Sequence, residues 1–155
     1  MKRFVDLIAE CLPKIKEVMP WDIDQLRQED PNLLILDIRE PYEYETARID
    51  NSLNVPRGIL ETACEYGYEE TIPELVKARE RPVLVICRSG NRSALAAYVM
   101  QQLGYRNVAS LKTGLRGWND YELPLIKADG QPLDMDDADE YFTPKVKPEQ
   151  MPPKY

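Results

Sequence analysis

The sequence predicts an α/β domain in which a small parallel β-sheet is flanked by helices on both faces. Short apolar runs alternate along the chain with segments whose apolar residues recur at helical spacing. Residues 33–36 and 82–86 are continuously apolar, which is typical of strands buried on both faces. The 155 residues are enough for one domain with its own hydrophobic core.

The elements of the first half follow from apolar spacing and from residues that begin or end helices. Apolar residues recur at helical spacing from Phe4 to Cys11, and Pro13 ends that helix. Asp22 is a candidate N-cap, and Pro41 begins a further turn. In chain order we expect a helix at 2–12, a strand at 15–19, a helix at 22–26, a strand at 33–36, a short helix at 41–45 and a strand at 52–55.

The second half continues the alternation and then changes character. Residues 58–81 predict two helical pieces with a break at Gly67, and Gly104 is a candidate residue just past the end of a later helix. We expect a strand ending at residue 87, a helix at 93–103, a strand at 107–111 and a helix at 114–121. The domain is therefore expected at 1–128, followed at 129–155 by an acidic, Pro-rich tail that is extended, disordered or wrapped on the surface.

Composition excludes several classes of function. The net charge of −7 argues against nucleic-acid binding. A membrane span is not expected, because the sequence contains no run of about 18 apolar residues. The three cysteines have no CxxC spacing, so neither a disulfide framework nor a zinc site is expected, and a cytoplasmic, reducing location suits a working thiol. The chain has no histidine, which excludes Ser-His and Cys-His catalysis and His-ligated metals. We expect no metal and no cofactor.

The most informative segment is residues 87–93, Cys-Arg-Ser-Gly-Asn-Arg-Ser. Cys87 ends a predicted buried strand and opens a tight loop that leads into a helix N-terminus. The helix dipole, the loop N–H groups and the guanidinium groups of Arg88 and Arg92 all favour negative charge, so this thiol should ionise easily. Cys87 is the candidate nucleophile.

The length of the loop favours one thiol chemistry over another. A Cys-x5-Arg loop is wide enough to hold a phosphate, whereas here Arg92 gives Cys-x4-Arg. The smaller loop suits a single sulfur atom carried on the thiolate, and so favours sulfur transfer. A Cys-based phosphatase or arsenate reductase, and a non-catalytic interaction module, remain the alternatives.

Four segments in order resemble the rhodanese family over residues 15–126. They are Leu-Ile-Leu-Asp-Ile-Arg-Glu-Pro-Tyr-Glu-Tyr at 34–44, Ile-Asp-Asn-Ser-Leu-Asn-Val-Pro at 49–56, Val-Ile-Cys-Arg-Ser-Gly-Asn-Arg-Ser-Ala at 85–94 and Leu-Lys-Thr-Gly-Leu-Arg-Gly-Trp at 111–118. The resemblance implies a thiosulfate sulfurtransferase (rhodanese) in which Cys87 accepts a sulfane sulfur from thiosulfate or from a persulfide donor. It implies a loop that binds the substrate and surrounds the resulting persulfide, made of Arg88, Ser89, Gly90, Asn91, Arg92 and Ser93.

Further expectations concern neighbouring residues and partners. Asp37 and Arg39, at the end of an adjacent strand, are either a structural ion pair or a support for an active-site arginine. Cys64 is either a helix-face residue or a resolving thiol. The expected partners are a small anionic sulfur donor and a thiol, thioredoxin-like or cyanide acceptor, with no nucleic acid and no membrane. The tail could recruit a protein.

Overall fold

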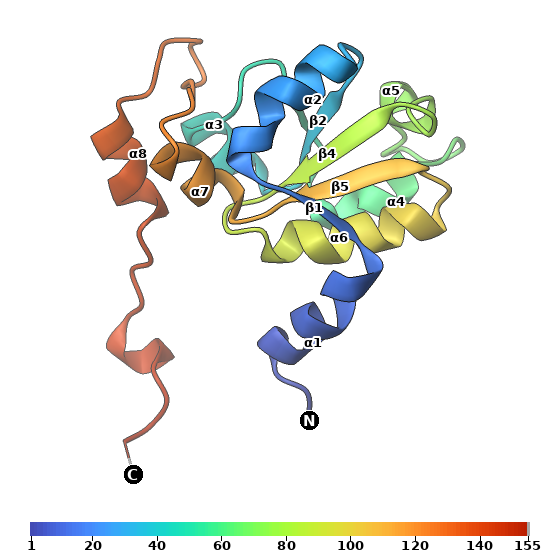
Figure 1. Cartoon of the computed structure of the whole chain (residues 1–155). Helices are drawn as coiled ribbons and strands as arrows, with labels where there is room; N and C mark the ends of the chain where they lie inside the picture. Colours follow the sequence, from blue (N-terminus) through green and yellow to red (C-terminus); the bar gives the residue numbers. More distant parts are fainter. Residues whose placement is uncertain (155) are drawn as a thin grey trace.

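The computed structural model describes residues 1–154, and it confirms the α/β fold with a parallel sheet flanked by helices (Figure 1). The strands are β1 (Lys16–Val18), β2 (Leu34–Asp37), β3 (Leu53–Asn54), β4 (Pro82–Ile86) and β5 (Asn107–Leu111). The α-helices are α1 (Phe4–Cys11), α2 (Ile23–Glu29), α3 (Pro41–Thr46), α4 (Leu60–Ala63), α5 (Pro73–Val76), α6 (Asn91–Gln102), α7 (Gly114–Asp120) and α8 (Met135–Phe142). Single 3-10 turns are η1 (Leu12–Lys14), η2 (Pro20–Asp22), η3 (Arg57–Ile59) and η4 (Pro148–Gln150).

The sheet places β4 at its centre. Its strand order is β1-β5-β4-β2-β3, and every neighbouring pair is parallel. All carboxyl ends therefore lie at one edge of the sheet, where ligands of open α/β sheets bind. Cys87 follows the carboxyl end of β4, between the ends of β2 and β5.

Alternate residues of the strands enter two separate cores, one on each face of the sheet. Leu34, Val83 and Val85 pack on one face with α4, α5 and α6, whereas Ile35 and Leu84 pack on the other with α2, α7 and α8. This alternation is why the central strands are apolar throughout. With both faces covered, the sheet is a rigid base for the loop at its carboxyl edge.

Two segments differ from the expectation. The predicted helical pieces at 58–81 shrink to the single turns α4 and α5, because Gly67 adopts a left-handed backbone and Tyr66 and Tyr68 lie exposed between them. Residues 129–155, expected as a tail that is extended, disordered or wrapped on the surface, contain a helix that the sequence analysis did not predict: α8 forms at 135–142, packs on the domain and buries Phe142.

None of the helices within residues 1–154 combines the length and the apolar character that a membrane span requires.

Candidate active site

The loop at 87–90 joins β4 to α6 and is shaped by Gly90. This residue has φ of +89°, a left-handed conformation that side chains other than glycine rarely adopt. A Cβ here would lie 3.0 Å from the backbone nitrogen of Thr113 and 3.1 Å from the carbonyl oxygen of Leu111. Glycine is therefore needed both for the turn and for its close approach to the segment between β5 and α7.

The sulfur of Cys87 is enclosed by hydrogen-bond donors. The residue is 1% exposed, and its Sγ accepts the backbone N–H of Gly90 at 3.1 Å and of Ser93 at 3.3 Å. The Cys87 thiol donates to the Oγ of Ser93 at 3.3 Å, and this oxygen lies 2.7 Å from the Oγ of Ser110. If Ser110 donates to Ser93, the Ser93 hydroxyl is free to donate to a sulfur anion. Together with the N-terminus of α6, these groups stabilise negative charge on this atom.

Helix α7 holds the same loop from behind. The backbone N–H of Leu115 donates to the carbonyl of Cys87 at 2.9 Å, and that of Arg116 donates to the carbonyl of Arg88 at 3.0 Å. This contact requires Gly114, because a Cβ there would lie 2.5 Å from the carbonyl carbon of Arg88. The segment at 111–118, the last of the four that resemble the rhodanese family, thus holds the first two peptide carbonyls of the loop.

Arg92 is paired within the protein. Its two terminal nitrogens donate to the two carboxylate oxygens of Glu43, each at 2.9 Å. Burial alone would raise the pKa of Glu43, but the hydrogen bonds from Arg92 and from the backbone N–H of Glu40, with the charges of Arg92 and Arg39, outweigh it, so this pKa lies below its usual value. The charge of Arg92 is therefore largely compensated before any substrate arrives.

Asp37 and Arg39 form a fully buried ion pair, the structural alternative of the two expected. The Nη2 of Arg39 lies 2.7 Å from Asp37 Oδ2, and both side chains are 0% exposed. Arg39 also donates to the carbonyls of Glu43 at 3.3 Å and Ala47 at 2.6 Å. The pair thus fixes α3, the helix that carries Glu43, and the charge of Arg39 also acts on the Glu43 carboxylate that binds Arg92.

Arg88, the residue after Cys87, contacts helix α8. Its Nη2 donates to the carbonyl of Phe142 at 2.8 Å, the one hydrogen bond of this side chain within residues 1–154. Arg88 also lines a cavity of about 130 Å³ together with Tyr42, Glu43 and Tyr141. The guanidinium therefore keeps further N–H donors for an anion.

The remaining predicted loop residues take different places. Ser89 is exposed and Asn91 is half-buried, and both line a separate cavity of about 190 Å³ that Ile8 and Lys112 also line. Within the described residues neither side chain is hydrogen-bonded to the Cys87 sulfur. The structure therefore brings Gly90 and Ser93 to the sulfur, and leaves the side chains of Ser89 and Asn91 on the outer side of the loop.

The other two cysteines are buried thiols. Cys64 is 0% exposed and Cys11 is 5% exposed, and both lack a disulfide partner within residues 1–154. Burial raises the pKa of each above the usual value. Cys64 lies among the apolar residues that pack α4 and α6 against the sheet, which favours the structural alternative over the resolving thiol.

Sequence reasoning missed two side chains of this site. Ser110 is a polar residue inside an otherwise apolar strand, a signal that could have identified it. Glu43 stands among the similar acidic residues Glu40 and Glu45, and only the fold selects it as the partner of Arg92.

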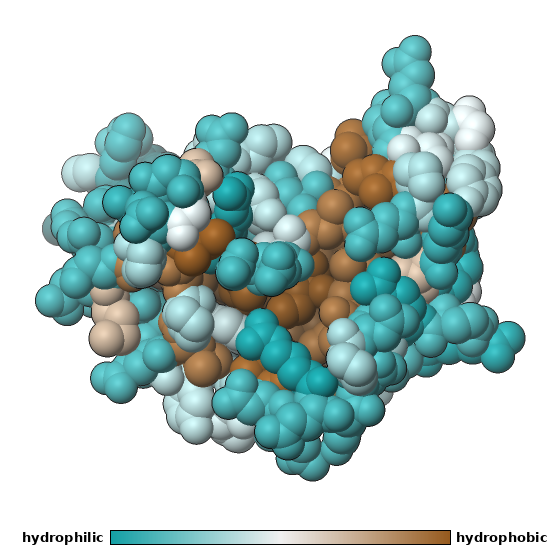
Figure 2. Space-filling view, turned by 90° about the horizontal axis from the view of Figure 1, so that it is seen from above, coloured by the Kyte–Doolittle hydropathy of each residue, from teal (hydrophilic) through white to brown (hydrophobic). Residues whose placement is uncertain are grey.

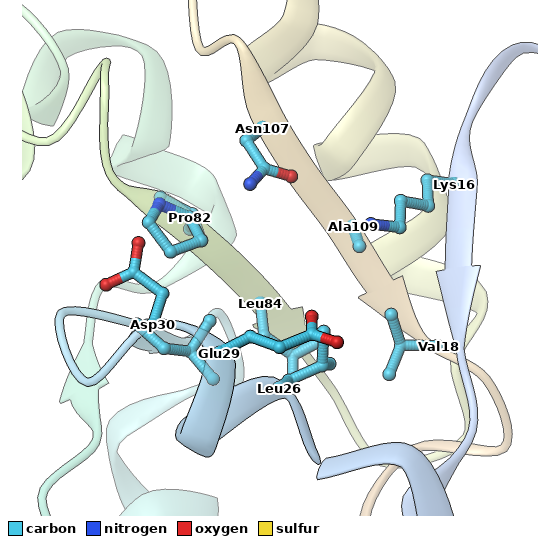
Figure 3. A pocket seen from close by; sticks show the side chains of 11 residues that line it. Lys16, Val18, Leu26, Glu29, Asp30, Pro82, Leu84, Asn107 and Ala109 are labelled. Atoms are coloured by element: carbon cyan, nitrogen blue, oxygen red, sulfur yellow. The ribbon is translucent and has the colours of Figure 1, made fainter.

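Two further cavities lie away from Cys87. One of about 100 Å³ lies at the amino ends of β4 and β5, where Pro82 and Asn107 line it (Figure 3). A groove of about 580 Å³ is lined by Leu33, Ile35 and Trp118 among others. Figure 2 shows apolar side chains gathered in a hollow on the side of the molecule that carries α2 and α7. Cys87 lines none of the four cavities described here.

Comparison with known proteins gives consistent matches. Residues 22–121 match the family described as Rhodanese-like domain. A protein of Allochromatium vinosum named sulfurtransferase is 31% identical over 117 residues, which are 75% of this chain and 99% of that protein. In relatives from Schizosaccharomyces pombe, Synechocystis and Bacillus subtilis the matched part spans only 54% to 66% of their length.

Solved structures share the fold. A Rhodopseudomonas palustris protein described as of unknown function and a possible tyrosine phosphatase superposes with a TM-score of 0.73 at 26% identity, covering 81% of this chain and 96% of that one. The polysulfide-sulfur transferase homodimer of Wolinella succinogenes superposes with a TM-score of 0.60 at 25% identity, covering 80% and 87%.

Proposed function

The chain belongs to the rhodanese-like domain family, and on that premise we propose that it is a sulfurtransferase whose Cys87 carries the transferred sulfur atom. The observation that carries the proposal is the sulfur of Cys87, which accepts two backbone N–H groups and lies beside the Ser93 hydroxyl. A chain without histidine needs a nucleophile that works without an imidazole base, and a stabilised thiolate is one.

In the first proposed step the Cys87 thiolate attacks the outer sulfur of thiosulfate. A new S–S bond forms to Cys87, the S–S bond of thiosulfate breaks, and its electron pair leaves with sulfite. The negative charge that was on Sγ now resides on the outer sulfur of a Cys87 persulfide. In this proposal the loop N–H groups stabilise this charge, each charge-assisted hydrogen bond contributing about 1.5–3 kcal/mol, and the positive charge of Arg88 in the same loop favours the anion.

In the second step an anionic acceptor takes the outer sulfur. Cyanide or a thiolate attacks it, the S–S bond to Cys87 breaks, and the electron pair returns to Sγ as thiolate. Thiocyanate or a new persulfide leaves. No net proton transfer occurs in either step, which is consistent with a site that holds no imidazole. We propose a small thiol or a thioredoxin-like thiol as acceptor and the cytoplasm as the setting, because a reducing compartment keeps Cys87 reduced.

The test is incubation with thiosulfate followed by intact-mass measurement and a thiocyanate assay with cyanide. We expect Cys87→Ser to fold, to gain no sulfur and to lose transfer. The matched control is Cys64→Ser, which removes a buried thiol outside the loop and should still gain one sulfur and transfer it. Undiminished transfer by Cys87→Ser would refute the proposal.

A phosphatase is the second candidate, because the Rhodopseudomonas palustris neighbour is described as a possible tyrosine phosphatase. Two features of this chain weigh against it. Arg92 is already paired with Glu43, and Asp37, which could protonate a leaving alcohol, is fully buried against Arg39. Turnover of p-nitrophenyl phosphate by the protein, with no sulfur adduct after thiosulfate, would favour the phosphatase instead.

A further inference from the structure

Residues 143–154 form an arm that follows α8, and every one of these residues is exposed. Figure 1 shows the arm leaving α8 and running away from the sheet. Beyond Thr143, its hydrogen bonds within residues 1–154 are internal and join Lys147 to Gln150 and Pro148 to Met151. The arm therefore adds nothing to the core of its own chain, and the side chain of Val146 is left 58% exposed.

The arm has the backbone of a polyproline II helix. Its φ and ψ are −67° and 125° at Thr143 and −81° and 156° at Lys147, close to the values of that helix. A polyproline II helix has three residues per turn, so successive side chains point about 120° apart. Val146 therefore points in one direction, and Lys145 and Lys147 point away from it to either side. A segment already extended in this way loses little conformational freedom when it binds.

A groove with an apolar floor lies between β1 and α2. The cavity of about 100 Å³ at the amino ends of β4 and β5 shares four lining residues with a second cavity of about 220 Å³, so the two are continuous. The floor consists of apolar side chains of α2, of the strands and of the segment before β2: Val18, Leu26, Leu33, Leu84 and Ala109. Figure 3 shows β1 and α2 on opposite sides of this floor. In the described part of the chain β1 is an edge strand that pairs only with β5.

Both rims of the groove are acidic. Glu17 lies on the β1 side, and Asp22, Glu29 and Asp30 lie on the α2 side, with Lys16 as the one base among the lining residues. Within residues 1–154 none of the four carboxylates forms an ion pair. The arm has the opposite charge, since residues 143–154 contain three lysines and one glutamate in a chain of net charge −7.

We propose that the arm of one copy of this chain docks in the groove of a second copy. Val146 covers the apolar floor, while Lys145 and Lys147 reach the acidic rims on either side of it. When both arms are exchanged, the two contacts are identical and the assembly closes as a dimer. The occupant is a second copy because the arm is exposed along its whole length in its own chain. This inference goes beyond the proposed sulfurtransferase function and does not depend on it.

The first experiment measures the oligomeric state by sedimentation velocity over a range of protein concentrations. We expect the full chain to form a dimer and a chain that ends at Phe142 to remain a monomer, because the deletion removes only the arm and keeps α8. Salt should weaken the dimer, since it screens contacts between exposed charges. A full chain that remains monomeric up to about 1 mM would overturn the proposal.

The second experiment tests the apolar contact. Val146→Asp places a charge on the apolar floor and should raise the dissociation constant of the dimer by about tenfold or more. The matched control is Val5→Asp on α1, because Val5 is 60% exposed, close to the 58% of Val146, and lies outside both arm and groove. Val5→Asp should leave the dissociation constant unchanged. Equal effects of the two substitutions would contradict a specific role of Val146.

The third experiment exchanges the charges of arm and rims. The arm variant Lys145→Glu with Lys147→Glu, and the rim variant Glu17→Lys with Glu29→Lys, should each dimerise about tenfold or more weakly than wild type, because like charges then face each other. An equimolar mixture of the two variants should recover the dimer, since each arm then meets a rim of opposite charge. A mixture that stays monomeric would refute this pairing of arm and groove.

A control for total charge is Lys77→Glu with Lys127→Glu, which alters two exposed lysines that do not line the groove. This variant has the same net charge as the arm variant and should dimerise like wild type. If it dissociates as readily as the arm variant, general repulsion explains the effect and the proposal fails. Circular dichroism of each variant shows whether a lost dimer reflects a lost fold.

Discussion

The pair between Glu43 and Arg92 gives the sharpest quantitative prediction, through the substitution Glu43→Gln. Glutamine has nearly the same shape as glutamate but no charge, so the change removes the ionic part of the contact. It also leaves a single side-chain oxygen to accept from Arg92 and from the backbone N–H of Glu40. Arg92 then keeps at most one good acceptor on this side chain. Because Arg92 lies on the first turn of α6, directly before Ser93, the loss acts on the loop around Cys87.

The expected magnitude follows from burial. Breaking a fully buried ion pair costs about 3–5 kcal/mol, whereas exposed pairs contribute about 0–1 kcal/mol. The Glu43 side chain is 10% exposed and that of Arg92 is 33% exposed, so water can partly rehydrate the arginine. We therefore expect Glu43→Gln to lower the free energy of unfolding at neutral pH by about 2 kcal/mol, midway between those limits.

The prediction is tested through its dependence on pH. The free energy of unfolding of wild type and variant is measured by urea unfolding between neutral and acidic pH. The pKa of Glu43 is lower in the folded protein than in the unfolded chain, so its stabilisation is complete above the unfolded value of about 4.3 and is lost as pH falls through the folded value. The difference between wild type and Glu43→Gln should therefore shrink below about pH 4. Glu45→Gln, an exposed residue of the same helix, is the control and should show no such difference. A difference that persists unchanged in acid would refute the ionic origin of the effect.

Three further predictions concern the residues that hold the site. Gly114→Ala should destabilise the fold by about 3 kcal/mol, because its Cβ would overlap the carbonyl carbon of Arg88; thermal unfolding measures this, and wild-type stability would contradict the close approach. Ser110→Ala should lower kcat/KM for sulfur transfer about two- to tenfold with the fold intact, since Ser93 loses the partner of its hydroxyl; unchanged kinetics would show that this hydrogen bond plays no part. Asp37→Asn should cost about 3–5 kcal/mol in urea unfolding because it leaves Arg39 buried without its counter-charge, and a loss below about 1 kcal/mol would show that water reaches the pair.

The parts of the fold that follow from short-range patterns could be predicted from the sequence. The apolar run before Cys87 and the helical spacing after it locate β4, α6 and the loop between them within one or two residues. Residues 58–81 could not be resolved in the same way. Their buried residues, such as Leu60 and Leu75, are anchored by tertiary contacts of two separate turns, which produce helical spacing without a continuous helix.

The sequence was enough to locate the loop of the candidate site, but not the hydrogen bonds that surround it. The choice of Cys87 as candidate nucleophile and the need for Gly90 follow from local sequence. The partners of the two arginines do not, because Glu43 is 49 residues from Arg92 and Phe142 is 54 residues from Arg88. In the second case the partner is a backbone carbonyl, which any residue supplies, so no side-chain pattern could reveal it.

The clamping of the loop by α7 has a consequence for the speed of the reaction. With the carbonyls of Cys87 and Arg88 tied to Leu115 and Arg116, the peptide planes of the loop have little freedom to rotate. The loop thus presents preorganised peptide dipoles, which are already aligned before any reaction takes place. In the proposed sulfur transfer the charge shifts from one sulfur to the next; few dipoles would then have to turn, and the reorganisation energy that bulk water would impose on such a step would be largely avoided.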